Sequence, residues 1–157
     1  MTLVEPSEDS ARLRLRRALQ RAPLFADLNS PGMTAIERQL TPLVLPGGAP
    51  LFRQGDPSDA VYVVASGCLG VFRHDEDDAA EGGPALIAEI TPGNIVGEMA
   101  LLSHSPHTRS VAALRDSEVW RLTKESFNAL TGHHPEVLPA LMRNVAVRNA
   151  MGPSKRR

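Results

Sequence analysis

The segment Val96–Val111, VGEMALLSHSPHTRSV, carries the residues of this chain that are best suited to hold an anionic ligand. Gly97 has no side chain, so a ligand can approach its backbone closely. The carboxylate of Glu98 can accept hydrogen bonds from sugar hydroxyls. Residues 99–102 lack β-branched side chains and suit one helical turn, whose first N–H groups can bind an anion. The segment therefore suits a sugar phosphate, although an ordinary turn whose apolar side chains plug a barrel explains it at least as simply.

Short apolar runs separated by turn residues make the middle of the chain, residues 43–122, rich in expected strands. Three of these runs are Val61–Val64, Leu69–Phe72 and Ala85–Ala88. Many short strands with Gly and Pro between them indicate a sandwich, a jelly roll or a small barrel. The stretch 74–83 holds five acidic residues, and we expect a hairpin loop there because the ligand spacing of a calcium loop is absent.

Two helices are expected before the strands. The first covers residues 10–22, where Ser10 is the expected N-cap, and the second covers residues 34–40 and is stopped by Pro42. The first helix carries five arginines within ten positions, namely Arg12, Arg14, Arg16, Arg17 and Arg21. Such a face can contact anionic lipid headgroups, a partner or RNA. The favoured interpretation is a solvated helix face whose arginine stems lie on the core.

Helices are also expected after the strands. Thr123 is the expected N-cap of one, and Gly132 is expected to end it. Residues 132–150 form a second helix by their apolar spacing after a proline, and residues 151–157 are expected to be a disordered tail. These patterns place the candidate ligand segment inside the strand region and helices on both sides of it.

Bulk properties narrow the class of protein. The chain has 157 residues, a net charge of −1 and one cysteine, Cys68. These values indicate one domain, argue against a globally basic nucleic-acid binder and exclude an internal disulfide. No apolar run approaches the ~20 residues that span a bilayer, and no signal peptide is apparent. We therefore expect a cytoplasmic domain.

Catalytic and metal-binding patterns are weak. No Gly-x-Ser-x-Gly motif occurs, and Cys68 is expected to pack or to lie in a turn rather than to react. A cupin-like metal site using His104 and His107 would need a following carboxylate and a distant histidine that this spacing does not supply. We therefore expect no enzyme activity, no metal and no cofactor.

The segment 96–111 resembles the phosphate-binding cassette of the cyclic nucleotide-binding domain family, known from catabolite activator protein and from regulatory subunits of cyclic-AMP-dependent kinase. Gly97–Leu102 matches the glycine, glutamate and alanine-leucine of that cassette. The resemblance continues in Leu51–Val64 and Arg115–Leu122, and it covers residues 24–149. The sequence of these segments is most similar to domains that precede patatin-like phospholipases and neuropathy-target-esterase-like lipases in bacteria.

This resemblance implies a mainly β fold, an eight-stranded antiparallel β-roll of the jelly-roll type with helices at both ends. The basic helix would occupy residues 1–23, the roll residues 24–131 and the capping helix residues 132–150. The implied function is a regulatory sensor that binds cAMP or cGMP and controls an effector such as a patatin-like lipase. Homo-oligomers and contact with a membrane surface are further expectations. DNA is not an expected partner, because too few residues follow the capping helix to form a helix-turn-helix.

The resemblance also implies roles for individual residues. Glu98 would hold the ribose hydroxyl, and backbone contacts would come from Gly97, Met99 and Ala100. In the family an arginine pairs with the cyclic phosphate. Counting without gaps places His107 at that position, whereas a loop two residues longer places Arg109 there; the ungapped count is preferred. Further donors would come from Thr108 and Ser110.

Each alternative has a physical consequence. An arginine–phosphate contact contributes about 1.5–3 kcal/mol, so its loss would weaken binding roughly ten- to a hundredfold. A histidine with a pKa of about 6.5 is mostly neutral at neutral pH, so binding should tighten as pH falls. In an extended strand residues 107 and 109 face one side, about 6.6 Å apart, so Arg109 would either rescue the site or pair with Glu98. We expect a retained but weakened site; the alternative is an interaction module that binds no nucleotide.

Overall fold

The computed structural model describes residues 8–21, 30–74, 83–97 and 105–139. In chain order its elements are α1 (Glu8–Arg21), α2 (Ser30–Gln39), β1 (Thr41–Leu45), β2 (Pro50–Phe52), β3 (Ala60–Ser66), β4 (Leu69–Arg73), β5 (Ala85–Ile90), β6 (Ile95–Val96), β7 (Ser110–Ala113), β8 (Ser117–Thr123) and α3 (Lys124–His133). The described residues thus contain eight strands with helices on both sides, which confirms the expected mainly β class.

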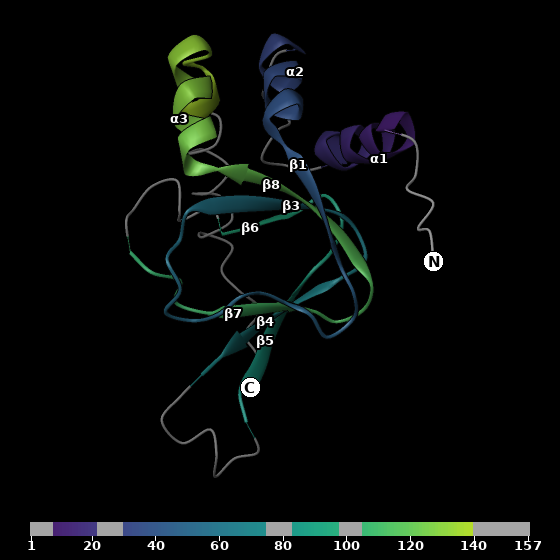
Figure 1. The fold of residues 1–157 in the computed structure, drawn as a ribbon, viewed down its shortest axis with the longest axis vertical. Coiled ribbons are helices and arrows are strands. Elements are labelled where there is room, and N and C mark those ends of the chain that lie inside the picture. Colours follow the sequence, from purple (N-terminus) through teal and green to yellow (C-terminus); the bar gives the residue numbers. More distant parts are fainter. Residues whose placement is uncertain (1–7, 22–29, 75–82, 98–104, 140–157) are drawn as a thin grey trace.

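The strands form two four-stranded antiparallel sheets that face each other (Figure 1). The first sheet has the order β1-β8-β3-β6 and the second the order β2-β7-β4-β5. The chain therefore passes repeatedly between the two sheets, and among the described strands only β4 and β5 are consecutive in the chain and paired in one sheet. This arrangement is the β-roll that the resemblance implied.

Two apolar cores lie on opposite faces of the first sheet. Alternate residues of a strand point to opposite faces, and the paired residues Val64 and Val119 lie in the core between the sheets. The neighbouring pair, Val63 and Trp120, lies in the core beneath the helices. The central strand β3 is buried over most of its length because apolar groups pack on both of its faces.

The helices close the second core. Leu15 and Leu19 of α1 are both 0% exposed, and they pack with Ile36 of α2 and Phe127 of α3. All three helices therefore cover the first sheet, as Figure 1 shows at the top of the molecule. Helix α1 is part of the packed fold and not a loosely attached basic arm.

Some helix limits differ from the sequence expectations. Helix α2 begins at Ser30, before the expected residue 34, because Pro31 lies in the first turn, where its missing N–H costs no hydrogen bond. Thr123 does cap α3, since its hydroxyl accepts from the N–H of Ser126 at 3.0 Å. Gly132 does not end that helix, which continues to His133, because a helical glycine costs only about 1 kcal/mol.

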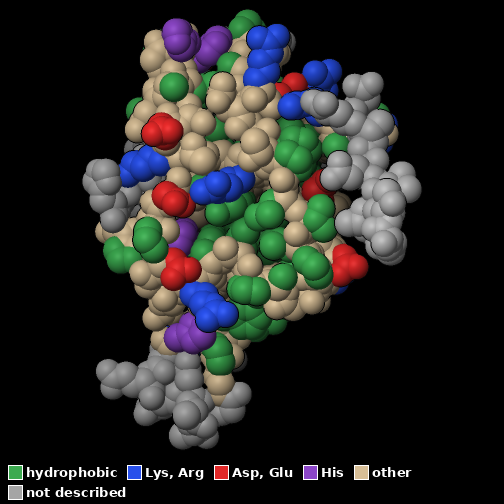
Figure 2. All heavy atoms as spheres, viewed as in Figure 1, with side chains coloured by type: hydrophobic (Ala, Val, Ile, Leu, Met, Phe, Trp, Pro, Cys, Tyr) green, Lys and Arg blue, Asp and Glu red, His purple; other side chains and the backbone are tan. Residues whose placement is uncertain are grey.

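Several expectations fall on residues outside the described ranges. Most of the acidic hairpin loop, most of the expected capping helix and the whole expected tail lie there, as residues 75–82 and 140–157. No helix of the described part is long and apolar enough to cross a membrane. Figure 2 shows hydrophobic side chains gathered across the middle of one face, below the helices.

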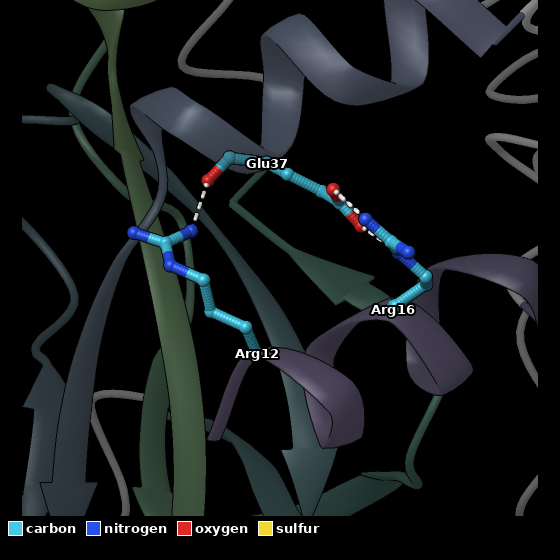
Figure 3. Close-up of polar contacts among 3 residues, drawn as sticks. All are labelled: Arg12, Arg16 and Glu37. Carbon is cyan, nitrogen blue, oxygen red and sulfur yellow. Dashed lines mark hydrogen bonds and ion pairs between the residues drawn. The ribbon is translucent and has the colours of Figure 1, made fainter. Parts of the chain in front are cut away.

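Arg12, Arg14 and Arg16 of α1 are paired within the protein. The guanidinium of Arg16 donates to both carboxylate oxygens of Glu37 in α2, at 2.9 and 3.0 Å. Arg12 donates to the backbone carbonyl of the same residue at 3.0 Å, and Figure 3 shows the two arginines reaching Glu37 from the neighbouring helix. Arg14 makes two bonds of 3.1 Å to the carboxylate of Glu118 in β8. These contacts fix α1 to both α2 and the first sheet.

Candidate functional site

The structure describes the beginning and the end of the predicted cassette. Gly97 follows β6, and residues 105–111 lead into β7. Glu98, Met99 and Ala100, together with His104, lie outside the described residues. The described part of the site therefore consists of Gly97, the residues around His107 and the loop between β2 and β3.

Gly97 occupies a backbone position that favours glycine. Its φ is +83°, in the left-handed region that side chains avoid. A Cβ added here would lie 3.0 Å from the carbonyl oxygen of Ala60 and 3.8 Å from the rings of Phe52 and His107. The cassette glycine is thus required by the turn itself, and its open side faces the histidine.

His107 is held at this place by its backbone. Its N–H donates to the carbonyl of Asp56 at 2.9 Å, and its own carbonyl accepts from the N–H of Gly55 at 2.8 Å. The imidazole lies flat on the ring of Phe52, with 3.6 Å between ring centroids and 6° between the planes. The structure therefore brings the imidazole of His107 next to Gly97.

The surroundings of His107 favour its neutral form. Burial lowers the pKa of His107 below its usual value, and this effect outweighs the carboxylates of Asp56 and Asp59, which act in the opposite direction. An imidazole with a lowered pKa carries little charge at neutral pH. It is a poor substitute for the permanent charge of a guanidinium.

The loop after β2 is fastened to the end of the cassette. The N–H of Gln54 donates to the hydroxyl of Ser110 at 2.8 Å. The hydroxyl of Ser58 donates to the carbonyl of Ser105. Within the loop the carboxylate of Asp56 accepts from the N–H of Arg53 at 2.9 Å. These bonds fix residues 53–59 and 105–110 as one unit, in which Ser110 already serves as an acceptor.

Arg109 is placed differently from the sequence expectation. Strand β7 begins only at Ser110, so residues 107 and 109 do not share a face of an extended strand. Arg109 and Thr108 are both exposed, and the guanidinium of Arg109 donates to the carbonyl of Thr108 at 2.9 Å. In this arrangement Arg109 points to solvent and does not accompany His107 in the roll.

Phe52 is the residue of the site that sequence reasoning missed. The stretch Leu51–Val64, which contains Phe52, predicts an early hairpin, and no local signal shows that this ring would meet the cassette. Phe52 belongs to the core between the sheets and also lies 6.1 Å from the ring of Tyr62. A large aromatic residue just before the Gly55 turn is the feature that could have suggested a partner for His107.

Of the other candidate chemistries, the metal site with His104 and His107 includes a residue outside the described ranges. Among the described residues, no group of three or more His, Cys, Asp or Glu side chains could hold a metal ion. Cys68 is buried, with its sulfur 3.7 Å from the carboxylate of Glu89, and burial raises the pKa of its thiol. A thiol with a raised pKa is a poor nucleophile, so Cys68 packs as the sequence suggested.

Comparisons with known proteins identify the family and the fold. Residues 42–134 match the family model described as the cyclic nucleotide-binding domain. The chain is 33% identical over 101 residues to a lysophospholipase of Neurospora crassa, a match that covers 64% of this chain and only 6% of that protein. The chain thus spans a small part of the length of this relative.

Two solved structures have the same fold. Catabolite activator protein from Thermus thermophilus superposes with a TM-score of 0.73 and 32% identity, covering 83% of this chain and 59% of that one. The regulatory domain of Toxoplasma gondii PKA, solved with cAMP, gives a TM-score of 0.69 and 25% identity over 82% of this chain and 47% of that one.

Proposed function

This chain belongs to the cyclic nucleotide-binding domain family, and we propose that it is a sensor that binds cAMP or cGMP with weakened affinity and controls an effector. One observation carries the proposal of weakened affinity. The side chain next to the cassette glycine is a half-buried histidine stacked on Phe52, at the position where the ungapped count expects an arginine.

The size of the weakening follows from the chemistry of the missing contact. A guanidinium can donate two hydrogen bonds to a phosphate and keeps its charge at every physiological pH. The neutral imidazole of His107 offers one N–H at most. Loss of about 1.5–3 kcal/mol corresponds to affinity reduced roughly ten- to a hundredfold relative to an arginine-containing cassette. Backbone N–H groups of the cassette would supply the remaining affinity.

The proposed effector is a lipase. The support is the Neurospora crassa lysophospholipase, in which the matched region makes up 6% of the protein and leaves ample length for another activity. This chain itself has no nucleophile motif of the Gly-x-Ser-x-Gly type, so we assign it regulation and not catalysis. The paired arginines of α1 argue against a membrane as the main partner of this chain. Arg12, Arg14 and Arg16 already donate hydrogen bonds to groups of the protein.

Isothermal titration with cAMP and with cGMP tests this proposal. We expect weak binding by the natural chain and a roughly ten- to hundredfold gain in affinity for His107→Arg. Arg109→Ala is the matched control, because it removes an exposed cation two residues away and should leave affinity unchanged. Loss of binding in Arg109→Ala would instead assign the phosphate contact to Arg109. Absence of heat for both the natural chain and His107→Arg would favour an interaction module without a nucleotide.

A further inference from the structure

The second sheet has an outer face that the described helices do not cover, since they pack on the first sheet (Figure 1). Val71 and Val111 are paired and lie with the core between the sheets. The next pair along the strands, Phe72 and Ser110, therefore points to the opposite, outer face. Ala112 lies two residues after Ser110 and shares that face.

A cavity of about 560 Å³ opens at one end of this sheet. Its lining is mostly apolar and includes Pro50, Phe52, Phe72, Val111 and Ala112, together with Arg53. The volume lies within the range of roughly 300–1,000 Å³ that is typical of small-molecule pockets. The cavity adjoins the candidate nucleotide site through Phe52 and Val111, which belong to the core between the sheets. Of its other strand residues, Phe72, Ser110 and Ala112 lie on the outer face.

Hydrogen bonds preform the walls of this cavity. The side-chain amide of Gln54 accepts from the N–H of His74 at 3.2 Å and donates to the carbonyl of the same residue at 3.4 Å. The N–H of Gln54 is bound to Ser110 in β7. The loop after β2, the end of β4 and the start of β7 are thus tied together, so a ligand would meet a fixed shape.

Among the described residues, the titratable side chains that line the cavity are all basic. They are Arg53 and His74, and no carboxylate is among the lining residues that the structure describes. The acidic residues of 75–82 lie outside the described ranges. A guanidinium beside two phenyl rings suits a ligand that combines a flat apolar body with one anionic group.

We propose that this cavity is a second ligand site, which borders the cyclic nucleotide site at Phe52 and Ser110, for a small amphipathic anion with an aromatic or similarly flat body. The apolar body would lie on Phe72, Ala112 and Pro50. The anionic group would lie beside Arg53. This site requires no nucleotide, so it stands or fails independently of the proposed sensor function.

Fluorescence titration with 8-anilinonaphthalene-1-sulfonate tests the site, with N-phenyl-1-naphthylamine as the probe that lacks the sulfonate. We expect Arg53→Gln to weaken binding of the sulfonate roughly fivefold and to leave the uncharged probe unaffected. Arg38→Gln is the matched control, because it removes an exposed cation at the end of α2. Ala112→Phe should fill the cavity and abolish the binding of both probes.

Two results of these titrations would overturn the proposal. Equal binding of the sulfonate by the natural chain, Arg53→Gln and Ala112→Phe would overturn the proposal. Equal losses in Arg53→Gln and Arg38→Gln would also overturn it, because they would show a general charge effect. Arg53→Gln requires no repacking, so it decides the question even if Ala112→Phe does not fold. Titration with cAMP in parallel reports on the nucleotide site separately.

Discussion

The imidazole of His107 and the phenyl ring of Phe52 lie face to face, with 3.6 Å between their centroids. This contact connects the end of the cassette to the strand β2 and removes part of the imidazole from water. It makes the histidine a packing residue of the roll as well as a candidate ligand contact. The protonation of His107 must therefore affect both the stability of the domain and its ligand binding.

Stability should decrease as His107 becomes protonated. The pKa of His107 is lowered in the folded state, so the unfolded chain binds more protons once pH falls below about 6.5. The contribution to stability is complete above that pH and is lost progressively down to the lower pKa of the folded state. Urea unfolding at about pH 7.5 and 5.5 measures it, and His107→Gln should show a smaller pH dependence. An identical pH dependence in the variant would contradict this account.

Nucleotide affinity should change with pH in the opposite sense. A bound phosphate raises the pKa of an adjacent imidazole, so binding takes up a proton when free His107 is neutral. Affinity for cAMP should therefore increase as pH falls from about 7.5 to 6, and it should stop increasing below the pKa of the free domain. His107→Arg should lose this pH dependence, and titration calorimetry in two buffers would detect the missing proton uptake.

Helix α1 should contribute strongly to stability. Leu19 is fully buried beneath the helices, so Leu19→Ala should cost about 2–5 kcal/mol. Leu13 lies on the same helix and is 50% exposed, so Leu13→Ala should cost less than about 0.5 kcal/mol. Chemical denaturation of both variants measures the difference. Similar small losses would show that α1 is not part of the cooperative fold.

Two glycines with similar backbone angles should tolerate alanine differently. Gly48 has a φ of +89° with nothing within 4 Å of an added Cβ, whereas Gly67 has a φ of +91°. A Cβ on Gly67 would lie 2.5 Å from the carbonyl oxygen of Asp116. Gly48→Ala should cost about 1–2 kcal/mol for the backbone angle, and Gly67→Ala should cost about 1–3 kcal/mol more. Thermal unfolding would test this, and equal losses would contradict the crowding at Gly67.

The fold was largely predictable because its signals are local. The run Val61–Val64 became the central strand β3, and Thr123 caps α3 as its hydroxyl and position suggested. The expected start of α2 at residue 34 was wrong because Pro31 lies in the first turn of the helix, a position that suits proline. The end of α3 was wrong because packing of Leu130 outweighs the weak preference of Gly132 against helix.

The site was predictable only in part because it depends on contacts between distant segments. The sequence pointed to Gly97 and His107, which the structure brings together. It could not show that Phe52, 55 positions earlier than His107, would stack on the imidazole. It also placed Arg109 on the inner face by assuming an extended strand that begins only at Ser110. The roles of Glu98, Met99 and Ala100, and of Thr108 and Ser110 toward a nucleotide, stay predictions.

Because α1 packs on the roll, a reporter protein built from this domain must keep that helix. The family model begins at residue 42, after α1 and α2, yet the chain before that residue supplies Leu15, Leu19, Ile36 and Leu40, each at most 1% exposed. A fusion protein that begins at residue 42 would lack α1 and α2, which pack on Trp120, and would expose this residue, which is 1% exposed in the intact fold. A fluorescent partner should therefore be joined ahead of Glu8, where it leaves the Arg16–Glu37 and Arg14–Glu118 pairs in place.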